Sequence, residues 1–211
     1  MNIIPVINCP DRACVEKTIA IARNFLGSDD WVHIDVTDGV FSKHATFSDP
    51  AAWNDMEIPF NFEVHLMVSH PEDYIAPWLA AEVNRIIVHV ESITPESSRD
   101  ILKACSEKGV KVMLALNPNT PIRELEPYIN SFSEFLVLSV SPGPGGQEFN
   151  SSVVDKIKIL KHEGVIIEVD GGMNAETALL VKNAGADIIA SGSYIFGNVD
   201  PKKAYEELKN I

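Results

Sequence analysis

Eight short runs rich in β-branched residues alternate with longer amphipathic runs along this chain, and this alternation constrains the fold more than any other feature. Strands that alternate with helices pair in parallel and are joined by right-handed crossovers. We expect strands over residues 3–8, 31–36, 62–68, 85–90, 111–116, 135–140, 165–169 and 188–191. Eight such strands predict an α/β fold closed into a (β/α)₈ TIM barrel, although periodicity alone does not distinguish it from an open doubly wound sheet.

The amphipathic runs predict the helices that join these strands. We expect helices over residues 14–26, 71–82, 95–107, 122–129, 153–162, 175–183 and 201–209. The segment 41–59 contains Pro50 and Pro59 and shows only a weak helical signal. At 211 residues, length gives no reason to divide the chain, so we expect a single domain over residues 1–211.

Charge and hydropathy exclude some classes of partner. A formal net charge of -13 argues against nucleic acid, because phosphate backbones bind clustered Lys and Arg. It does not exclude a small phosphorylated substrate, since backbone amides can hold a phosphate. No apolar run approaches the roughly 20 residues of a membrane-spanning helix, and the N-terminus lacks the marks of a signal peptide. We therefore expect a cytoplasmic protein that does not bind membranes.

The three cysteines are Cys9, Cys14 and Cys105. Their odd number and the lack of a Cys-x-x-Cys spacing fit a reducing compartment better than a disulfide framework.

Histidine and aspartate gather where the predicted strands end. His33 and Asp35 are two positions apart on one strand and face the same side, while His65 lies near the end of the third strand and Asp170 just after the seventh. Two imidazoles and two carboxylates suit one divalent ion of Zn, Fe, Mn or Co. Each residue also has a structural interpretation, as a hydrogen-bonded strand histidine or a loop-capping aspartate. Convergence at one barrel face puts the metal interpretation on a level with the structural one; nothing in the spacing of His89 favours ligation over packing.

Glycines follow the last three predicted strands. The segment 141–147 reads Ser-Pro-Gly-Pro-Gly-Gly-Gln, and Gly171-Gly172 and Gly192-Ser193 occupy the next two junctions. Glycine allows a ligand to approach the backbone closely, and the last strand ends of such barrels often bind phosphate. These loops predict an anion site made mostly of backbone amides.

Five ordered segments together resemble the ribulose-phosphate 3-epimerase family. They are residues 32–39 (VHIDVTDG), 64–67 (VHLM), 139–147 (SVSPGPGGQ), 168–172 (EVDGG) and 191–197 (SGSYIFG). The resemblance runs over nearly the whole chain. It implies a barrel enzyme, an isomerase that uses a divalent metal to epimerise C3 of a ketose phosphate, most simply D-ribulose 5-phosphate to D-xylulose 5-phosphate through an enediolate.

The same resemblance assigns roles residue by residue. His33, Asp35, His65 and Asp170 match the metal ligands, and Asp35 and Asp170 also match the acid/base pair. The positions that match substrate contacts are Cys9, Met67, Gly143, Gly145, Gly146, Gly171, Gly172, Gly192 and Ser193.

Several wall positions depart from the family pattern. Cys9 stands where a substrate-contacting serine is typical, and Thr37 and Leu138 each replace a methionine. Ser141, Pro144 and His44 replace an asparagine, a phenylalanine and an asparagine. We predict His44 to be a loop residue rather than a contact.

These departures leave three alternatives. The first is a 3-epimerase of another ketose phosphate, such as a hexulose 6-phosphate. The second is a barrel decarboxylase or hexulose-phosphate synthase. Such relatives typically carry an Asp-x-Lys-x-x-Asp motif at a strand end, and the stretch 35–39 (DVTDG) has no lysine, so this alternative is disfavoured. The third is a catalytically inactive sugar-phosphate-binding barrel. We also expect a homo-oligomer, although apolar helix residues that would support self-association are equally expected in the barrel's packed shell.

Overall fold

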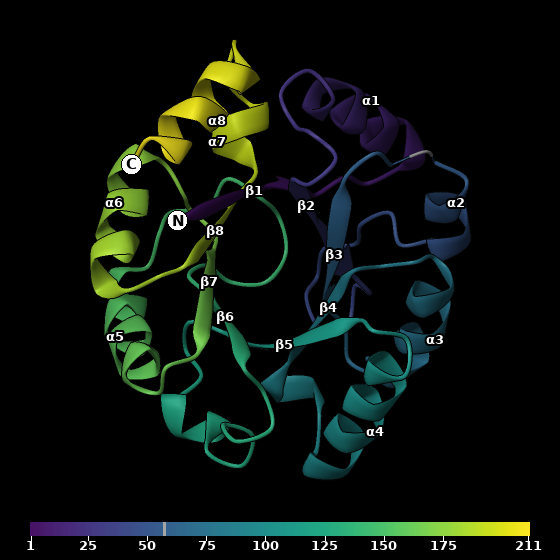
Figure 1. Cartoon of the computed structure of the whole chain (residues 1–211), viewed down its shortest axis with the longest axis vertical. Helices are drawn as coiled ribbons and strands as arrows, with labels where there is room; N and C mark the ends of the chain where they lie inside the picture. Colours follow the sequence, from purple (N-terminus) through teal and green to yellow (C-terminus); the bar gives the residue numbers. More distant parts are fainter. Residues whose placement is uncertain (57) are drawn as a thin grey trace.

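Eight parallel strands form a closed barrel in chain order, and the last strand pairs with the first (Figure 1). The computed structural model describes residues 1–56 and 58–211. The strands are β1 (Asn2–Ile7), β2 (Trp31–Thr37), β3 (Asn61–Met67), β4 (Arg85–His89), β5 (Lys111–Leu116), β6 (Glu134–Leu138), β7 (Ile166–Asp170) and β8 (Ile188–Ser191). All eight predicted strands are confirmed, and closure excludes the open sheet.

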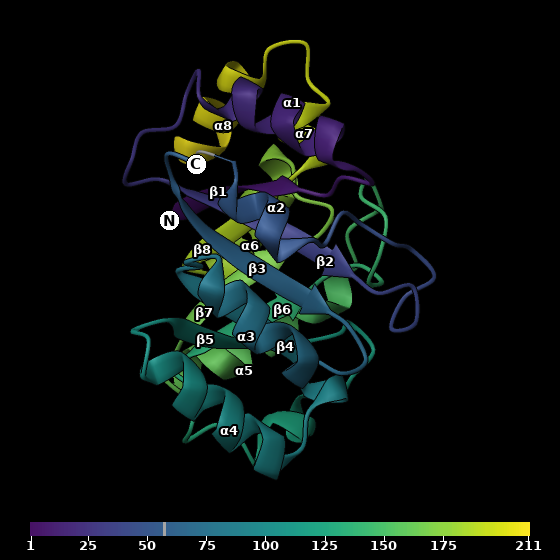
Figure 2. The ribbon, with the colours of Figure 1, turned by 90° about the vertical axis from the view of Figure 1, so that its right-hand side faces the viewer.

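Helices surround the barrel. They are α1 (Arg12–Ala22), α2 (Pro50–Asn54), α3 (Glu72–Ala80), α4 (Pro95–Ser106), α5 (Val154–His162), α6 (Ala175–Ala184), α7 (Ser193–Phe196) and α8 (Pro201–Lys209), with 3₁₀ turns η1 (Val90–Ser92), η2 (Ile122–Leu125) and η3 (Ser151–Val153). Figure 2 shows α2, α3 and α4 following one another along one side. None of the helices in the described part of the chain has the length and apolar character needed to cross a membrane.

Two connections differ from the sequence prediction. The helix predicted over residues 122–129 is wrong: only one 3₁₀ turn forms there, because Pro127 has no N–H with which to continue a helical hydrogen-bond ladder. Conversely, the segment with the weak helical signal contains α2. Its N-cap is Asp49, which accepts hydrogen bonds from the amides of Ala51 and Ala52, and Pro50 occupies the first turn.

The strands divide their residues between two environments. On β2, Val32, Ile34 and Val36 belong to the large apolar cluster between barrel and helices, whereas His33 and Asp35 make polar contacts inside the barrel. Successive side chains of a strand point to opposite faces, so one set packs against the helices and the other faces the barrel interior.

The barrel interior is itself divided. A separate small apolar cluster on β4, β5 and β6 consists of Ile87, Met113, Ala115, Leu136 and Leu138. The polar side chains come mainly from β2, β3 and β7. In the register of the sheet, Asp35 on β2 lies beside His65 on β3, and Asp170 on β7 lies beside Leu138 on β6. The carboxyl ends of these strands therefore present one mixed polar and apolar floor.

Candidate metal centre and substrate pocket

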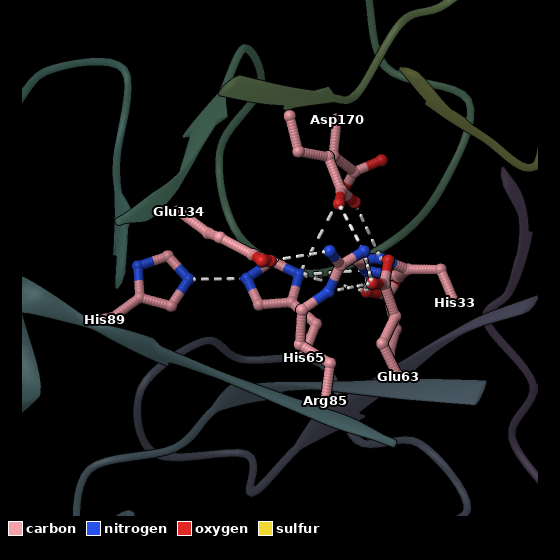
Figure 3. A network of polar contacts seen from close by, with 9 residues as sticks. His33, Glu63, His65, Arg85, His89, Glu134 and Asp170 are labelled. Atoms are coloured by element: carbon pink, nitrogen blue, oxygen red, sulfur yellow. Dashed lines mark hydrogen bonds and ion pairs between the residues drawn. The ribbon is translucent and has the colours of Figure 1, made fainter. Parts of the chain in front are cut away.

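Four polar side chains converge near the carboxyl ends of β2, β3 and β7 (Figure 3). They are His33, Asp35, His65 and Asp170, and one ligand atom from each lies within 4.8 Å of all the others. Nε2 of His33 is 3.2 Å from Nδ1 of His65, and each nitrogen is 3.3 Å from Oδ1 of Asp35. All four residues are buried, so the structure brings together the complete predicted ligand set.

The protonation pattern of this cluster fits a cation. Nδ1 of His33 lies 2.7 Å from the carboxylate of Glu63, which accepts a hydrogen bond, so in the neutral ring Nε2 carries a lone pair. That lone pair points toward Asp35, whose buried Oδ1 accepts no hydrogen bond from the described residues. A buried carboxylate oxygen without a donor is costly, and a divalent ion satisfies it together with the imidazole nitrogens.

The two aspartates have opposite protonation tendencies. Burial raises the pKa of Asp35, but the adjacent imidazoles of His33 and His65 outweigh it and hold that pKa well below its ordinary value. Burial and then the negative charge of Asp35 raise the pKa of Asp170 to about 8. At neutral pH and without metal, the pair therefore holds one proton, on Asp170.

The two histidines differ in the same way. Burial lowers the pKa of His33, yet the surrounding carboxylates of Asp35, Glu168 and Glu63 raise it well above the ordinary value. Burial lowers the pKa of His65 to about 4, against the nearby carboxylate of Asp35, which raises it. His65 is therefore the neutral ring of the pair, and cation binding must displace a proton from His33.

A charged layer lies beneath the four-residue cluster and was not predicted from sequence. Arg85 donates from Nε to Glu63 at 2.6 Å and from a terminal nitrogen to Glu134 at 2.8 Å, and a further terminal nitrogen lies 3.3 Å from Glu168. Glu63 and Glu168 both face Nδ1 of His33, at 2.7 and 3.2 Å. The sequence did indicate two residues of this layer. Glu63 and Glu168 each precede a predicted ligand by two positions and so lie on the same side of the strand as that ligand.

Asn8 is a second residue that the sequence interpretation missed. Its Nδ2 donates to Oδ2 of Asp35 at 2.8 Å and to the carbonyl of Gly143 at 3.0 Å. Its Oδ1 lies 3.1 Å from Nε2 of His44. His44 lies in the loop after β2, as predicted, and its contact with Asn8 reaches Asp35 through one side chain. Asn8 links the aspartate to the glycine loop.

A pocket of about 350 Å³ opens above Asp35 and Asp170. All the residues predicted to contact substrate line it: Cys9, Met67, Gly143, Gly145, Gly146, Gly171, Gly172, Gly192 and Ser193. His33 and His65 lie beneath it and are fully buried. The described lining residues include no lysine or arginine.

Two of these glycines are required by close packing. At Gly171, where φ is +101°, a Cβ would lie 2.5 Å from a methyl of Val140. At Gly172, where φ is +62°, it would lie 2.6 Å from the backbone nitrogen of Phe149. Any side chain here would push apart the loops after β6 and β7.

The cysteine prediction is wrong for one pair. Cys9 and Cys14 form a disulfide, and Cys105 is free and buried. The chain turns from β1 into α1 between them, which brings their Cα atoms to 5.6 Å although no Cys-x-x-Cys spacing is present. Both cysteines line the pocket, so Cys9 presents a disulfide sulfur, not a thiol, to this wall.

Thiol counting tests this pairing. We expect unfolding under non-reducing conditions to expose one alkylatable thiol, Cys105, and prior reduction to expose three. Intact mass after iodoacetamide treatment gives the count, and Cys105→Ser is the control, with an expected count of none before reduction. Three thiols in unreduced wild-type protein would contradict the pairing.

Comparisons with known proteins identify the family of this chain. The family model described as "Ribulose-phosphate 3 epimerase family" matches residues 3–196. A ribulose-phosphate 3-epimerase of Bacillus subtilis is 38% identical over 99% of this chain and 98% of its own length. One of Schizosaccharomyces pombe is 32% identical over 99% and 92%. The solved structure of KGPDC from Streptococcus mutans, 11% identical, superposes with a TM-score of 0.77 over 99% of this chain and 95% of that one, and shares the fold. The chain belongs to the ribulose-phosphate 3-epimerase family, and is therefore an isomerase.

Proposed function

We propose that this chain interconverts D-ribulose 5-phosphate and D-xylulose 5-phosphate by metal-assisted proton transfer at C3. The observation that carries the proposal is the pairing of Asp35 and Asp170, two carboxyl groups with opposite protonation tendencies at the base of one pocket. Family membership supports the reaction class.

Epimerisation beside a ketone needs one group to remove the C3 proton and another to return a proton to the opposite face. In one direction the Asp35 carboxylate is the base and the Asp170 carboxyl is the acid; in the other direction the roles exchange. Between the two transfers the substrate is a planar enediolate. The amide of Asn8, hydrogen-bonded to Oδ2 of Asp35, orients the base.

His33, Asp35, His65 and Asp170 would hold one divalent ion of Zn, Fe, Mn or Co. When bound, this ion supplies positive charge beside the sugar oxygens that become negative in the enediolate. The orphan Oδ1 of Asp35 supports this assignment.

The phosphate would bind at the glycine loops, from Gly143–Gly146 to Gly192 and Ser193. Met67 and Leu138 also line the pocket, on strands that neighbour those of Asp35 and Asp170. They would contact the carbon chain of the sugar. Cys9 would close the wall on the β1 side. The homo-oligomer and the cytoplasmic location remain predictions from the sequence.

Hydrogen exchange tests the reaction directly. Metal-loaded protein in D₂O should incorporate deuterium at C3 of ribulose 5-phosphate and form xylulose 5-phosphate, both followed by NMR. The chelated protein is the control and should show neither. Exchange that does not depend on metal would contradict the metal assignment alone.

A substrate panel separates the remaining alternatives. Folded, metal-loaded protein that ignores ribulose 5-phosphate but epimerises a hexulose 6-phosphate would replace the proposed substrate. Binding of a sugar phosphate without exchange on any ketose phosphate would identify an inactive barrel.

A further inference from the structure

His65 is connected on its far side to a chain of polar groups outside the pocket lining. Its Nε2 lies 2.8 Å from Nε2 of His89, and Nδ1 of His89 lies 3.0 Å from Oε2 of Glu91. Figure 3 shows the contact between the two imidazoles, directed away from Asp170. Both rings are fully buried, 4.9 Å apart and within 13° of parallel. The proposed reaction uses neither His89 nor Glu91.

The hydrogen-bond partners of Glu91 determine which atoms donate and which accept in this series of polar groups. Its Oε1 accepts from the backbone N–H of Asn117 at 2.9 Å and from the hydroxyl of Thr120. Its Oε2 faces His89, and an ionised carboxylate can only accept. Nδ1 of His89 therefore carries a proton.

The direction propagates from one ring to the next. In the neutral form of His89 the ring has a single N–H, which Nδ1 carries, and its Nε2 is then an acceptor. The contact of 2.8 Å then requires Nε2 of His65 to donate, which leaves Nδ1 of His65 with a lone pair. That nitrogen is the one that faces the cluster, 3.2 Å from Nε2 of His33 and 3.3 Å from Oδ1 of Asp35.

We propose that His89 and Glu91 are positioning residues that fix the tautomer of His65 and so present its Nδ1 lone pair to a divalent ion. The inference rests on the metal site of the proposed function. It also explains why the two histidines offer different nitrogens. His33 donates from Nδ1 directly to Glu63 and offers Nε2, whereas His65 donates from Nε2 through His89 and offers Nδ1. Outer partners of this kind orient metal-binding imidazoles in general.

The substitution Glu91→Gln reverses the direction of the hydrogen bonds from His65 through His89 to residue 91, while the side chain keeps nearly the same volume. The Asn117 N–H is a fixed donor, so it draws the amide oxygen of glutamine to the Oε1 position. The amide NH₂ then faces Nδ1 of His89 and donates to it. His89 must move its proton to Nε2, His65 must accept there, and Nδ1 of His65 becomes protonated.

Two-bond ¹H–¹⁵N spectra of the histidine rings in metal-free protein test this tautomer inversion. We expect the proton of His65 on Nε2 in the wild type and on Nδ1 in Glu91→Gln. We expect Glu91→Gln to bind Co²⁺ or Zn²⁺ about 10–100-fold more weakly in chelator competition. Thr120→Val is the matched control: it removes the other side-chain partner of Glu91 but keeps the carboxylate toward His89, so tautomers and affinity should match the wild type.

The outcomes separate this inference from the proposed function. The same His65 tautomer in wild type and Glu91→Gln, or an unchanged metal affinity, would overturn the positioning role. The expected tautomers in a wild-type protein that binds neither metal would overturn the metal site and leave the hydrogen-bond relay standing.

Discussion

Replacing Asp170 by asparagine should lower kcat for epimerisation by about 10²–10⁴-fold while the fold is retained, because one of the two proton-transfer groups is lost. Asparagine keeps the shape of the side chain but can neither remove nor return a proton at C3. Asp35 remains in place and still faces the C3 hydrogen of one epimer. That epimer should therefore exchange C3 hydrogen for deuterium in D₂O without forming the other.

Steady-state kinetics and NMR exchange, each started from both ketopentose phosphates, measure these effects. Asp187→Asn is the control, since this aspartate caps the start of β7 and binds Lys161, outside the substrate pocket. It should leave kcat unchanged. Wild-type turnover by folded, metal-loaded Asp170→Asn protein would remove Asp170 from the acid/base pair.

Replacing His65 by alanine should weaken metal binding by more than the roughly 10–100-fold expected for changes outside the ligand set. The substitution removes one of two imidazole donors and leaves a buried gap. His65→Gln, which fills more of that gap, should keep the thermal midpoint closer to wild type while also binding metal weakly. Chelator competition gives the affinities and calorimetry gives the midpoints.

His162→Ala serves as the control for the loss of an imidazole, because His162 is exposed at the end of α5. Its metal affinity should equal that of the wild type. If His65→Ala and His65→Gln both retain wild-type metal content and affinity, His65 is not a ligand.

The barrel could be predicted from the sequence because strand and helix periodicities are local. Val32, Ile34 and Val36 alternate with His33 and Asp35, and this alternation predicts the strand and places His33 and Asp35 on the same face. Parallel pairing then places all strand ends on one side, which is why His33, Asp35, His65 and Asp170 could be grouped in advance. The helix predicted over residues 122–129 failed where Pro127 interrupts an otherwise amphipathic run.

The parts of the site that escaped prediction depend on pairing between side chains distant in sequence. Arg85 and Glu168 are 83 positions apart, and nothing near either residue indicates the other. Asn8 and His44 meet only because the loop after β2 returns to the end of β1. The Cys9–Cys14 bond, by contrast, joins residues only five positions apart and depends on the turn into α1 rather than on a spacing motif.

The split interior of the barrel separates two properties on which natural variation or redesign can act. The acidic and imidazole groups of β2, β3 and β7, together with Arg85 at the start of β4, form a set of ion pairs beneath the proposed acid/base pair. The apolar half contributes Leu138 to the pocket wall, and this residue takes no part in that charge balance. Exchanging Leu138 for a larger or smaller apolar residue therefore resizes the space for the sugar while the charges stay matched. Reaction chemistry and substrate length can evolve on different strands of one barrel.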